Sequence, residues 1–546
     1  MRTNKSIAVI MSIAVAMIVG VYIGHLSTST TTGTTSLTQT NGYKKINALL
    51  HIIEKDYVDT VDISKIVEGA IPKVLSELDP HSIYIPAKDL EATNAGLNGS
   101  FGGIGIQFSI QKDTIHVNQV IHGGPSEKVG LMPGDRIVTI NDSLFVGKEV
   151  TVQSAPQRLK GPKGTNVKLG ILRTGEKQLL HFNITRDNIP IYSVDATLML
   201  TPKWGYIKLN KFGRTTYSEV ITSIARLKQQ NCKGLIFDLR GNTGGYLEAA
   251  TQVINEFLSK KDLIVYTKGK KWTRNDIYAN GMGSCKDLPL VILIDEGSAS
   301  ASEIFSGAIQ DNDRGTIIGR RSFGKGLVQE PAEFMDGSAI RLTVARYYTP
   351  SGRCIQKPYV DGADEKYQMD ILERYEHGEF FSKDSIKQNK EIVYRTKIGR
   401  KVYGGGGIMP DIFVPQDTLN YTPYYRTVVN RGVPLSFAFQ YTDKHRKELE
   451  VFTNTLDLYN YLKQQDLVKQ LVNYASSKGV TKRNKQIYKS RELLDKYVSG
   501  SIIYNILGLE SYIGFLNSTD KTIQKAINIL DKGEWRPKPS KKAEEK

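Results

Sequence analysis

The hydrophobic and polar positions of this chain change their period several times along its length. Between residues 43 and 78 the apolar residues recur at the spacing of a helix. Between residues 96 and 186 short apolar segments separated by glycine-containing turns predict strands. From residue 421 onwards the chain is amphipathic and poor in glycine, which predicts a second helical region.

The part between residues 191 and 418 alternates aliphatic strands with amphipathic helices. The predicted strands are residues 206–209, 234–239, 263–266, 290–294, 316–319 and 340–344, and the predicted helices are residues 218–227, 247–258 and 301–310. Such alternation is typical of an α/β layer in which helices cover a sheet. We therefore expect an α/β core in which all these strands belong to one sheet.

These changes of pattern predict a multidomain protein of the α/β class, because 546 residues exceed one ordinary core. The expected parts are an N-terminal helical segment (43–95), a β-rich domain with short helices (96–190), the α/β core (191–418) and a helical C-terminal extension (419–546). Residues 26–42 form a Ser/Thr-rich tether that is too polar to build a core.

The N-terminus has the pattern of an export signal. Arg2 and Lys5 precede an apolar run from Ile7 to Ile23. The run is at the short limit for crossing a bilayer, so that residues 1–25 form either a signal anchor or a cleaved signal peptide, and we favour the single-pass anchor. In both cases we expect an exported body on the periplasmic side of the inner membrane, with membrane contact through this segment only.

Composition argues against two classes of function. The net charge of +17 could attract nucleic acid, but the basic residues are dispersed and no nucleic-acid-binding motif accompanies them. The three cysteines, Cys232, Cys285 and Cys354, are widely spaced and match neither a metal site nor a disulfide framework. We expect no nucleic-acid partner, no metal and no cofactor.

A run of small residues carries the candidate nucleophile. Ser300 stands in Gly297-Ser-Ala-Ser-Ala-Ser-Glu303, where the carboxyl end of a predicted strand turns into a helix. If Ser300 begins the helix, the N–H of Ala301 points at the reacting carbonyl and the helix dipole favours the oxyanion. A second glycine-rich turn offers another donor through Gly244 or Gly245. A serine at such a place can also cap the helix, and the two roles are compatible.

The candidate base is Lys325, in Phe323-Gly-Lys-Gly326. No histidine occurs between residues 181 and 377, so that lysine is the base on offer to a serine nucleophile. Lysine is protonated at neutral pH, and burial away from carboxylates lowers its pKa. Gln329 can hydrogen-bond to the amine without adding charge. The same run begins like a phosphate loop, but the following Ser or Thr and the helix of such a loop are missing.

The β-rich domain resembles a PDZ domain. The resemblance rests on the turn Gly103-Ile-Gly-Ile106, the short helix from Ser126 and the strand at residues 136–140, which follow one another in the order of that family. We expect the backbone N–H groups of Gly103, Ile104, Gly105 and Ile106 to hold the terminal carboxylate of a peptide, which is added to the neighbouring edge strand. The alternative is an ordinary glycine turn.

Over roughly residues 43–417 the chain resembles the C-terminal processing (tail-specific) serine peptidases. The motifs that carry this resemblance are Ser298-Ala-Ser-Ala-Ser-Glu303, Phe323-Gly-Lys-Gly326 with Gln329, Asp238-Leu-Arg-Gly-Asn-Thr-Gly-Gly245, Leu78-Asp-Pro-His-Ser82 and Gly404-Gly-Gly-Gly-Ile-Met-Pro-Asp411. The resemblance implies that Ser300 is the nucleophile, Lys325 its base and Gln329 the residue that orients the lysine. The region beyond residue 421 lies outside it, so that no role is carried over there.

The sequence therefore indicates an exported serine endopeptidase that captures protein C-termini on a PDZ domain and forms an acyl-enzyme with a Ser300/Lys325 dyad. The expected partners are substrate proteins with apolar C-termini, and the sequence leaves open whether an adaptor or a second copy takes part. The alternative is a PDZ-based binding or scaffold protein with an inactive or partner-activated peptidase core. The presence of Ser300, Lys325 and Gln329 argues against that alternative.

Overall fold

The computed structural model describes residues 41–111, 113–271, 273–360, 364–387 and 391–539. These residues fall into two compact units that divide after Lys73. The first contains α2 (Asn41–Asp56) and most of α3 (Ile63–Ser76), in agreement with the helical period of the sequence. The predicted export segment lies outside the described residues. None of the helices within the described residues has the length and the apolar character that crossing a membrane requires.

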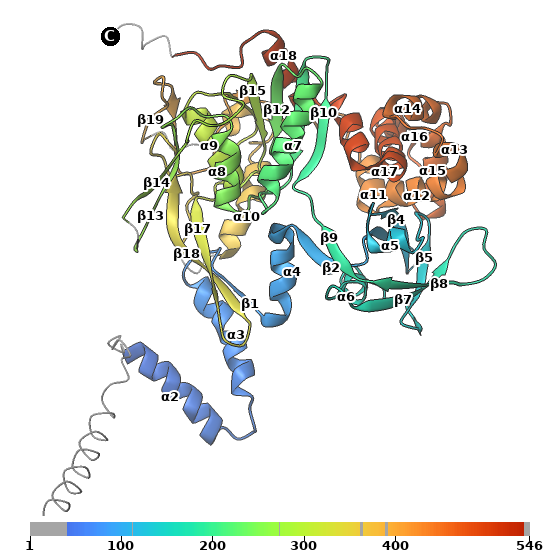
Figure 1. Ribbon diagram of the computed structural model, residues 1–546, viewed down its shortest axis with the longest axis horizontal. Coiled ribbons are helices and arrows are strands. Elements are labelled where there is room, and N and C mark those ends of the chain that lie inside the picture. The colour runs from blue at the N-terminus through green and yellow to red at the C-terminus, as the bar shows by residue number, and fades with distance from the viewer. Residues whose placement is uncertain (1–40, 112, 272, 361–363, 388–390, 540–546) are drawn as a thin grey trace, which may run out of the picture. The chain divides into compact units, whose positions relative to one another are not determined.

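A six-stranded sheet forms the core of the second unit (Figure 1), in the order β10-β11-β12-β15-β16-β21. The first pair is antiparallel and the other pairs are parallel. The strands are β10 (Val194–Met199), β11 (Trp204–Leu209), β12 (Gly234–Asp238), β15 (Leu290–Ile294), β16 (Thr316–Gly319) and β21 (Ile412–Phe413). Parallel strands need crossover connections, which α7 (Thr216–Gln229), α8 (Leu247–Asn255) and α9 (Ala301–Asp311) supply.

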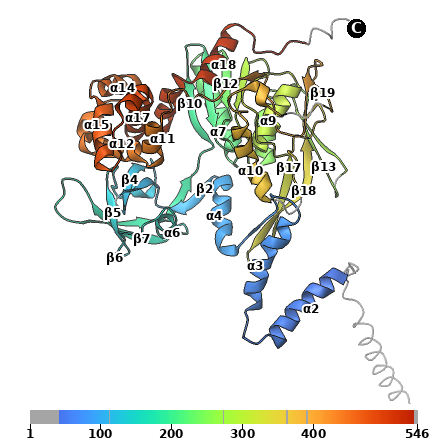
Figure 2. The same ribbon diagram turned by 180° about the vertical axis from the view of Figure 1, so that it is seen from behind.

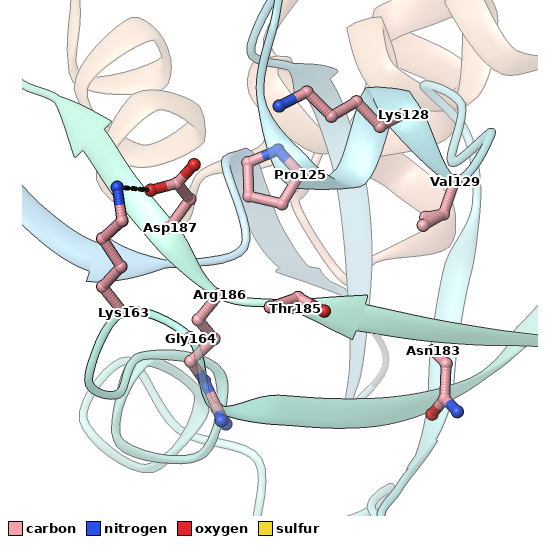
Figure 3. Close-up of a pocket in the computed structure, with 9 residues that line it drawn as sticks. All are labelled: Pro125, Lys128, Val129, Lys163, Gly164, Asn183, Thr185, Arg186 and Asp187. Carbon is pink, nitrogen blue, oxygen red and sulfur yellow. Dashed lines mark ion pairs between the residues drawn. The ribbon is translucent and has the colours of Figure 1, made fainter.

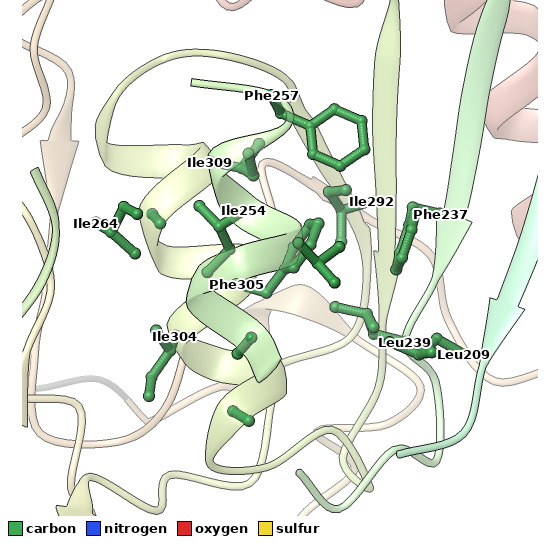
Figure 4. Packing of buried hydrophobic residues seen from close by; sticks show 14 of the residues in the cluster. Leu209, Phe237, Leu239, Ile254, Phe257, Ile264, Ile292, Ile304, Phe305 and Ile309 are labelled. Carbon is green, nitrogen blue, oxygen red and sulfur yellow. The ribbon is translucent and has the colours of Figure 1, made fainter. Parts of the chain in front are cut away.

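Successive residues of the parallel strands face two different apolar clusters. In β12, Leu235 and Phe237 join the cluster that the sheet shares with α8 and α9, whereas Ile236 joins the cluster on the opposite face. Phe305 of α9 stacks on Phe237, with ring centroids 5.0 Å apart (Figure 4). Because both faces of the strands are buried, the strands are continuously aliphatic, as the sequence analysis assumed.

The opposite face of the sheet is covered by α18 (Lys521–Asp531), which belongs to the helical extension. Ile523, Ala526 and Ile529 of this helix pack in one cluster with Ile236 and Leu293 of the sheet. α18 contacts β15 and β16, and it lies at the same end of the chain's central sheet in Figure 1 and Figure 2. The last helix of the extension is therefore part of the α/β core.

Two of the predicted strands form a separate antiparallel sheet, which corrects the expectation of one sheet. β13 (Leu263–Gly269) pairs with β14 (Asn275–Tyr278) and β18 (Ala339–Tyr348), and β18 also pairs with β1 (Ile83–Ile85) and β17 (Leu327–Glu333). A tight turn at Gly337, whose φ is 84°, joins β17 to β18. A parallel pairing would need a crossover connection, for which this turn is too short. β18 therefore pairs antiparallel with β17 and does not join the first sheet.

The β-rich domain has the strand order β3-β4-β5-β7-β8, with β6 paired to β5. Its elements are β3 (Ile106–Gln111), β4 (Thr114–Val120), α5 (Pro125–Lys128), β5 (Arg136–Ile140), β6 (Ser143–Leu144), α6 (Ser154–Leu159), β7 (Asn166–Leu172) and β8 (Leu180–Thr185). β2 (Ser100–Gly103) pairs with β9 (Asp187–Pro190) outside this sheet. β3 lies at an edge of the sheet, which is where a peptide can be added as a further strand.

The C-terminal extension is helical, as predicted. Its helices before α18 are α11 (Pro423–Asn430), α12 (Val433–Lys444), α13 (Arg446–Leu449), α14 (Thr455–Lys463), α15 (Leu467–Ser477), α16 (Asn484–Lys489) and α17 (Arg491–Asn517). Helical geometry is interrupted in α17 at Gly508, with φ 83° and ψ −176°. Before this break the Tyr504 carbonyl accepts a hydrogen bond from Gln119 of β4 (2.9 Å), and after it Glu510 pairs with Arg226 of α7 (2.7 Å). α17 therefore contacts both the β-rich domain and the α/β core.

The sequence pattern does not predict α4 (Ala87–Asn98), α10 (Asp364–Glu376) or the short hairpin of β19 (Tyr394–Arg395) and β20 (Lys401–Val402). The mean hydropathy of α10 is low, and none of the described parts of these elements carries a long apolar stripe. An apolar period is the main sequence signal of a helix, so that elements of this kind escape it.

We predict that Phe305→Ala destabilises the protein by about 3–5 kcal/mol, because it leaves a cavity among the rings of Phe212, Phe237 and Phe257. Urea unfolding followed by circular dichroism measures the change. Tyr488→Ala is the matched control, because this ring is 83% exposed and its loss should change stability by no more than about 0.5 kcal/mol. A loss below about 1 kcal/mol for Phe305→Ala would contradict the central place of this ring.

Candidate active site

Ser300 has a strained backbone, with φ 54° and ψ −114°. A positive φ costs a residue with a side chain about 1–3 kcal/mol and persists only where the surroundings enforce it. The enforcing contact is the turn after β12, where a Cβ atom built on Gly244 would lie 2.8 Å from Ser300 Cβ and 3.0 Å from Ala301 N. Only glycine fits at this point. The structure therefore brings the two predicted strand-to-helix turns into direct contact at Ser300.

The hydroxyl groups of the two neighbouring serines are bonded to the turn after β12. Ser298 and Ser302 are fully buried, and their hydroxyl groups donate to the carbonyl oxygens of Leu239 and Asn242, each at 2.8 Å. These bonds hold the two turns against each other. Ser300 is the one serine of the run that is partly exposed. Of the three, it alone presents its side chain where a substrate can reach it.

Lys325 is half-buried in the loop between β16 and β17. Its Nζ donates to Gln329 Oε1 at 2.9 Å, and within the described residues no hydrogen bond joins this amine to Ser300 Oγ. The Tyr347 hydroxyl contacts the carbonyl oxygen of Ser300 (3.1 Å) and also that of Lys325. In addition, the N–H of Phe323 donates to the carbonyl of Ser298 (3.0 Å). The lysine loop is thus attached to the serine run at two points.

A buried carboxylate, that of Glu303, joins the same two loops. Its Oε2 accepts the N–H groups of Ser300 (2.9 Å) and Lys325 (2.8 Å), and its Oε1 accepts the N–H of Gly324 (2.7 Å) and the hydroxyl of Ser322 (2.5 Å). Burial raises the pKa of Glu303 to about 7, and these hydrogen bonds oppose the rise. Since all four partners donate, they match the ionised carboxylate.

Glu303 was not predicted as a site residue and appeared only as the end of the small-residue run. The signal that could have revealed it is the spacing Ser300-x-x-Glu303, in which a glutamate three residues after a cap returns to the cap's own N–H. The structure shows that bond. The links from Glu303 to Gly324 and Lys325 have no such signal.

Burial is the main cause that lowers the pKa of Lys325, as the sequence analysis expected. The positive charge of Arg341 lowers it further, while the carboxylates of Asp79 and Glu303 raise it. The expectation that no carboxylate lies nearby is therefore incorrect. Neither Asp79 nor Arg341 is close to Lys325 in the sequence, which is why the pattern of residues could not place them there.

The turn after β12 is supported by a buried ion pair that extends into the C-terminal extension. Asp238 is 1% exposed and binds the guanidinium of Arg240 at 2.7 Å. The positive charges of Arg240 and Lys208 hold the pKa of Asp238 well below its usual range against the effect of burial. Arg240 also pairs with Asp520 (2.7 Å), the residue that caps α18. The extension therefore contributes a charge to the support of the active-site turn.

Three backbone N–H groups were predicted to stabilise an oxyanion. That of Gly244 is already engaged, because it donates to Asn242 Oδ1 at 2.8 Å. Ala301 is the first residue of α9, and the N–H of such a residue has no acceptor within its helix. Phe212 forms its two hydrogen bonds with Gly244 O and Tyr246 N, the groups on either side of Gly245. The N–H of Gly245 therefore points away from Phe212. Ala301 and Gly245 are thus the better-placed donors.

The predicted carboxylate-binding residues meet at the beginning of β3. The carbonyl of Ile104 accepts the N–H of Ser126 (3.0 Å), and the carbonyl of Gly105 accepts the N–H of Ile121 (2.9 Å). In a trans peptide unit the N–H points opposite to the carbonyl. The N–H groups of Gly105 and Ile106 are therefore directed away from these partners. Gly103 forms the end of β2 and pairs with Asp187 of β9.

A hollow of about 320 Å³ is lined by residues of α5, of β8 and of the turn at Lys163 and Gly164 (Figure 3). Two of its three basic side chains, those of Lys163 and Arg186, already have partners. Lys163 pairs with Asp187 at 2.7 Å, and the guanidinium of Arg186 donates to the carbonyls of Leu159 (3.0 Å) and Arg158 (3.0 Å). For a peptide carboxylate the structure thus offers backbone N–H groups at the loop. Lys163 and Arg186 in the hollow are already paired.

A larger hollow of about 720 Å³ lies beside the lysine loop. Phe323 and Lys357 line it, and the N–H of Lys357 donates to the carbonyl of Gly324 (2.9 Å). The ammonium group of Lys357 lies 4.2 Å from the centre of the Phe323 ring and pairs with Asp370 (3.0 Å). No cluster of His, Cys, Asp and Glu among the described residues could hold a metal ion.

Comparison with known proteins identifies four regions. Residues 203–364 match peptidase family S41, and residues 102–184 match the PDZ domain. Residues 21–89 match the N-terminal domain of the activating protease CtpB. Residues 424–508 match a family of unknown function, DUF8443.

Three relatives have names that agree with one another. A carboxy-terminal-processing protease of Bartonella bacilliformis is 37% identical over 59% of this chain and 75% of its own length. The carboxy-terminal processing protease CtpA of Bacillus subtilis is 32% identical over 65% of this chain and 78% of its own length. For CtpB of the same organism the identity is 33%, over 58% of this chain and 66% of that protein.

Proposed function

This chain belongs to the carboxy-terminal processing proteases of peptidase family S41, serine-type peptidases with a PDZ domain, and we propose that Ser300 and Lys325 carry out its hydrolysis. The single observation that supports this assignment most is the pairing of the two loops by Glu303. One carboxylate binds the backbone N–H of both Ser300 and Lys325, so that the two residues share one anchor. Gln329 is the hydrogen-bond partner of the lysine.

In the proposed reaction Ser300 Oγ attacks the carbonyl carbon of the scissile peptide bond while neutral Lys325 takes the hydroxyl proton. The N–H groups of Ala301 and Gly245 stabilise the oxyanion. The lysine then gives the proton to the leaving amine, and the acyl group stays on Ser300. Water attacks this ester with Lys325 as base, which releases the product and restores the hydroxyl.

We further propose that substrates are captured by their free C-terminus at β3. An extended peptide would continue the sheet beside this edge strand, and its carboxylate would accept the N–H groups of Gly105 and Ile106. The apolar character of Ile104 and Ile106 suits an apolar final residue. Residues 7–23 would keep the enzyme at the outer side of the cytoplasmic membrane.

We predict that Ser300→Ala and Lys325→Ala each lower kcat by about 10⁴-fold or more, and that the double variant is hardly worse, because the two residues act as a unit. Peptide hydrolysis and labelling of the serine by a fluorophosphonate measure the effect. Ser259→Ala and Lys260→Ala are matched controls at exposed positions and should have normal activity. Labelling of the Ser300→Ala variant, or an active Lys325→Ala variant, would refute the dyad. Absence of labelling in the unmodified protein would instead favour a binding protein.

We predict that kcat/KM rises with pH, because Lys325 must lose its proton to act as a base. Burial and Arg341 lower its pKa, which brings this rise to a lower pH than for a free lysine. Ionisation of Glu303, whose pKa is about 7, would produce a rise in the same direction. Temperature separates the two, since deprotonation of an ammonium group is strongly endothermic and ionisation of a carboxyl group is nearly athermal. A profile that falls as the pH rises through neutrality would contradict the proposal, as would an active Lys325→Arg variant.

We predict that amidation of the C-terminus weakens the capture of a peptide by about tenfold to a hundredfold, because charge-assisted hydrogen bonds worth about 1.5–3 kcal/mol are lost. The measurement compares the binding and the cleavage of the free-acid and amidated forms of one peptide with an apolar last residue. The Ser300→Ala variant allows binding to be measured without turnover. Equal binding of the two forms would remove the C-terminus from recognition and leave the proposed dyad untouched.

A further inference from the structure

The side-chain amide of Gln329 lies between Lys325 and a turn that occurs much earlier in the chain. Its Oε1 accepts a hydrogen bond from Lys325 Nζ (2.9 Å), and its Nε2 donates to the carbonyl oxygen of His81. A carbonyl oxygen can only accept hydrogen bonds, so that the NH₂ end of the amide must face His81 and the oxygen end must face the lysine. The position of the His81 carbonyl therefore decides which end of Gln329 meets Lys325.

The carboxylate of Asp79 holds this carbonyl in place. Asp79 Oδ1 accepts the N–H groups of His81 (2.9 Å) and Ser82 (3.0 Å), and Oδ2 accepts the Ser82 hydroxyl (2.6 Å). Thr343 donates its hydroxyl to Asp79 Oδ1 (3.0 Å) and its N–H to Ser82 Oγ (3.1 Å). Asp79 and Ser82 are each 5% exposed. The turn is thus a buried, fully bonded unit attached to β18.

The point of attachment is directly opposite Gln329. Thr343 of β18 pairs with Gln329 of β17, and the register of the two strands shifts between Val328 and Gln329. A bulge of this kind redirects a side chain, and bulges are frequent next to active sites. On its other side the turn is held by a hydrogen bond between His81 Nε2 and the Tyr367 hydroxyl (2.9 Å). The turn and the amide are therefore aligned by the same hairpin.

We propose that Asp79 is a positioning residue of the hydrolytic reaction, which acts on Lys325 through the His81 carbonyl and the Gln329 amide. The proposal rests on the function proposed above, in which neutral Lys325 takes the proton of Ser300. A neutral amine has N–H groups and one lone pair. When the oxygen of Gln329 faces it, Lys325 donates an N–H there and keeps its lone pair for the serine. If the NH₂ end faced the lysine, the lone pair would accept an amide N–H and be lost to the reaction.

The charged and titratable groups around Lys325 separate two effects of Asp79. Arg341 faces the amine from β18, Glu303 from α9, and Asp79 and His81 from the turn. Burial and the charge of Lys325 lower the pKa of His81 to about 4, so that its ring is neutral at pH 7. The charge of Asp79 raises the pKa of Lys325. Asp79 thus orients the amide by hydrogen bonds and also favours the protonated lysine.

A double-mutant cycle in the full-length enzyme tests the route through Gln329. We expect Asp79→Ala and Gln329→Ala each to lower kcat by about tenfold to a hundredfold, with little change in KM because the peptide is captured elsewhere. The double variant should be no slower than Gln329→Ala alone, because Asp79 has nothing to orient once the amide is gone. Asp89→Ala, an exposed carboxylate of α4, is the matched control. Multiplication of the two single effects would overturn the proposal.

The pH profile supplies a readout that a purely structural role would not change. Asp79→Asn keeps an oxygen acceptor for the N–H groups of the turn and removes the charge. Because that charge raises the pKa of Lys325, we expect the rise of kcat/KM to move to lower pH in this variant. An unchanged profile, or a shift to higher pH, would contradict the proposal.

A variant that fails to fold does not decide the matter, so a second variant carries the test. If Asp79→Ala loses its cooperative thermal transition, Ser82→Ala replaces it in the cycle, since it removes the hydroxyl that donates to Asp79 Oδ2 and accepts the Thr343 N–H, without changing the charge. It should lower kcat, be non-additive with Gln329→Ala and leave the pH profile unchanged. An active Lys325→Ala variant would defeat the function proposed above. An inactive Lys325→Ala variant beside an Asp79→Ala variant with unchanged kcat would defeat this inference alone.

Discussion

The buried carboxylate of Glu303 is the interaction on which the geometry of the active site depends. A charge without solvent is costly unless hydrogen bonds satisfy it, and here four donors from two loops converge on it. The same bonds satisfy the N–H groups of Ser300, Gly324 and Lys325, which would otherwise lack acceptors in a buried place. Removal of the carboxylate would therefore leave both loops without their common anchor. The proposed nucleophile and base are thus anchored by one carboxylate.

This anchor explains why strain at Ser300 is tolerated. The positive φ of Ser300 and the close approach of Gly244 are both unfavourable for an isolated chain. The hydrogen bonds of Ser298, Ser302 and Glu303 hold the turn in this conformation. Ser300 and Lys325 lie at strand ends and in loops, while the aliphatic strands of the sheet supply rigidity. The difference appears within a single run: Ser298 and Ser302 are buried and bonded to the neighbouring turn, and Ser300 between them is partly exposed.

The sequence allowed the elements of the core and the identities of the candidate residues to be predicted, because both depend on short-range patterns. Aliphatic runs predicted β12 and β15, and the small residues around Ser300 and Lys325 drew attention to these two positions. What the sequence could not predict are contacts between residues far apart in the chain. Asp79 meets Thr343, and Arg240 meets Asp520, without any spacing that would reveal them. The single-sheet expectation failed for a related reason, since strand order depends on connections and not on the strands themselves.

The helical extension illustrates how a boundary in the sequence pattern can differ from a boundary in packing. The pattern becomes helical near residue 421, yet α18 covers one face of the central sheet and buries Ile236 and Leu293. Without that helix, the aliphatic residues on this face of the sheet would meet water, at a cost of about 25 cal/mol for each Å² of apolar surface. Asp520 at the beginning of the same helix forms an ion pair with Arg240, and Arg240 also pairs with Asp238 at the start of the glycine turn. A chain shortened to its family-like region would therefore lose both the cover of its sheet and part of the support of its active site. The extension belongs to the enzyme's catalytic fold, whatever else its remaining helices do.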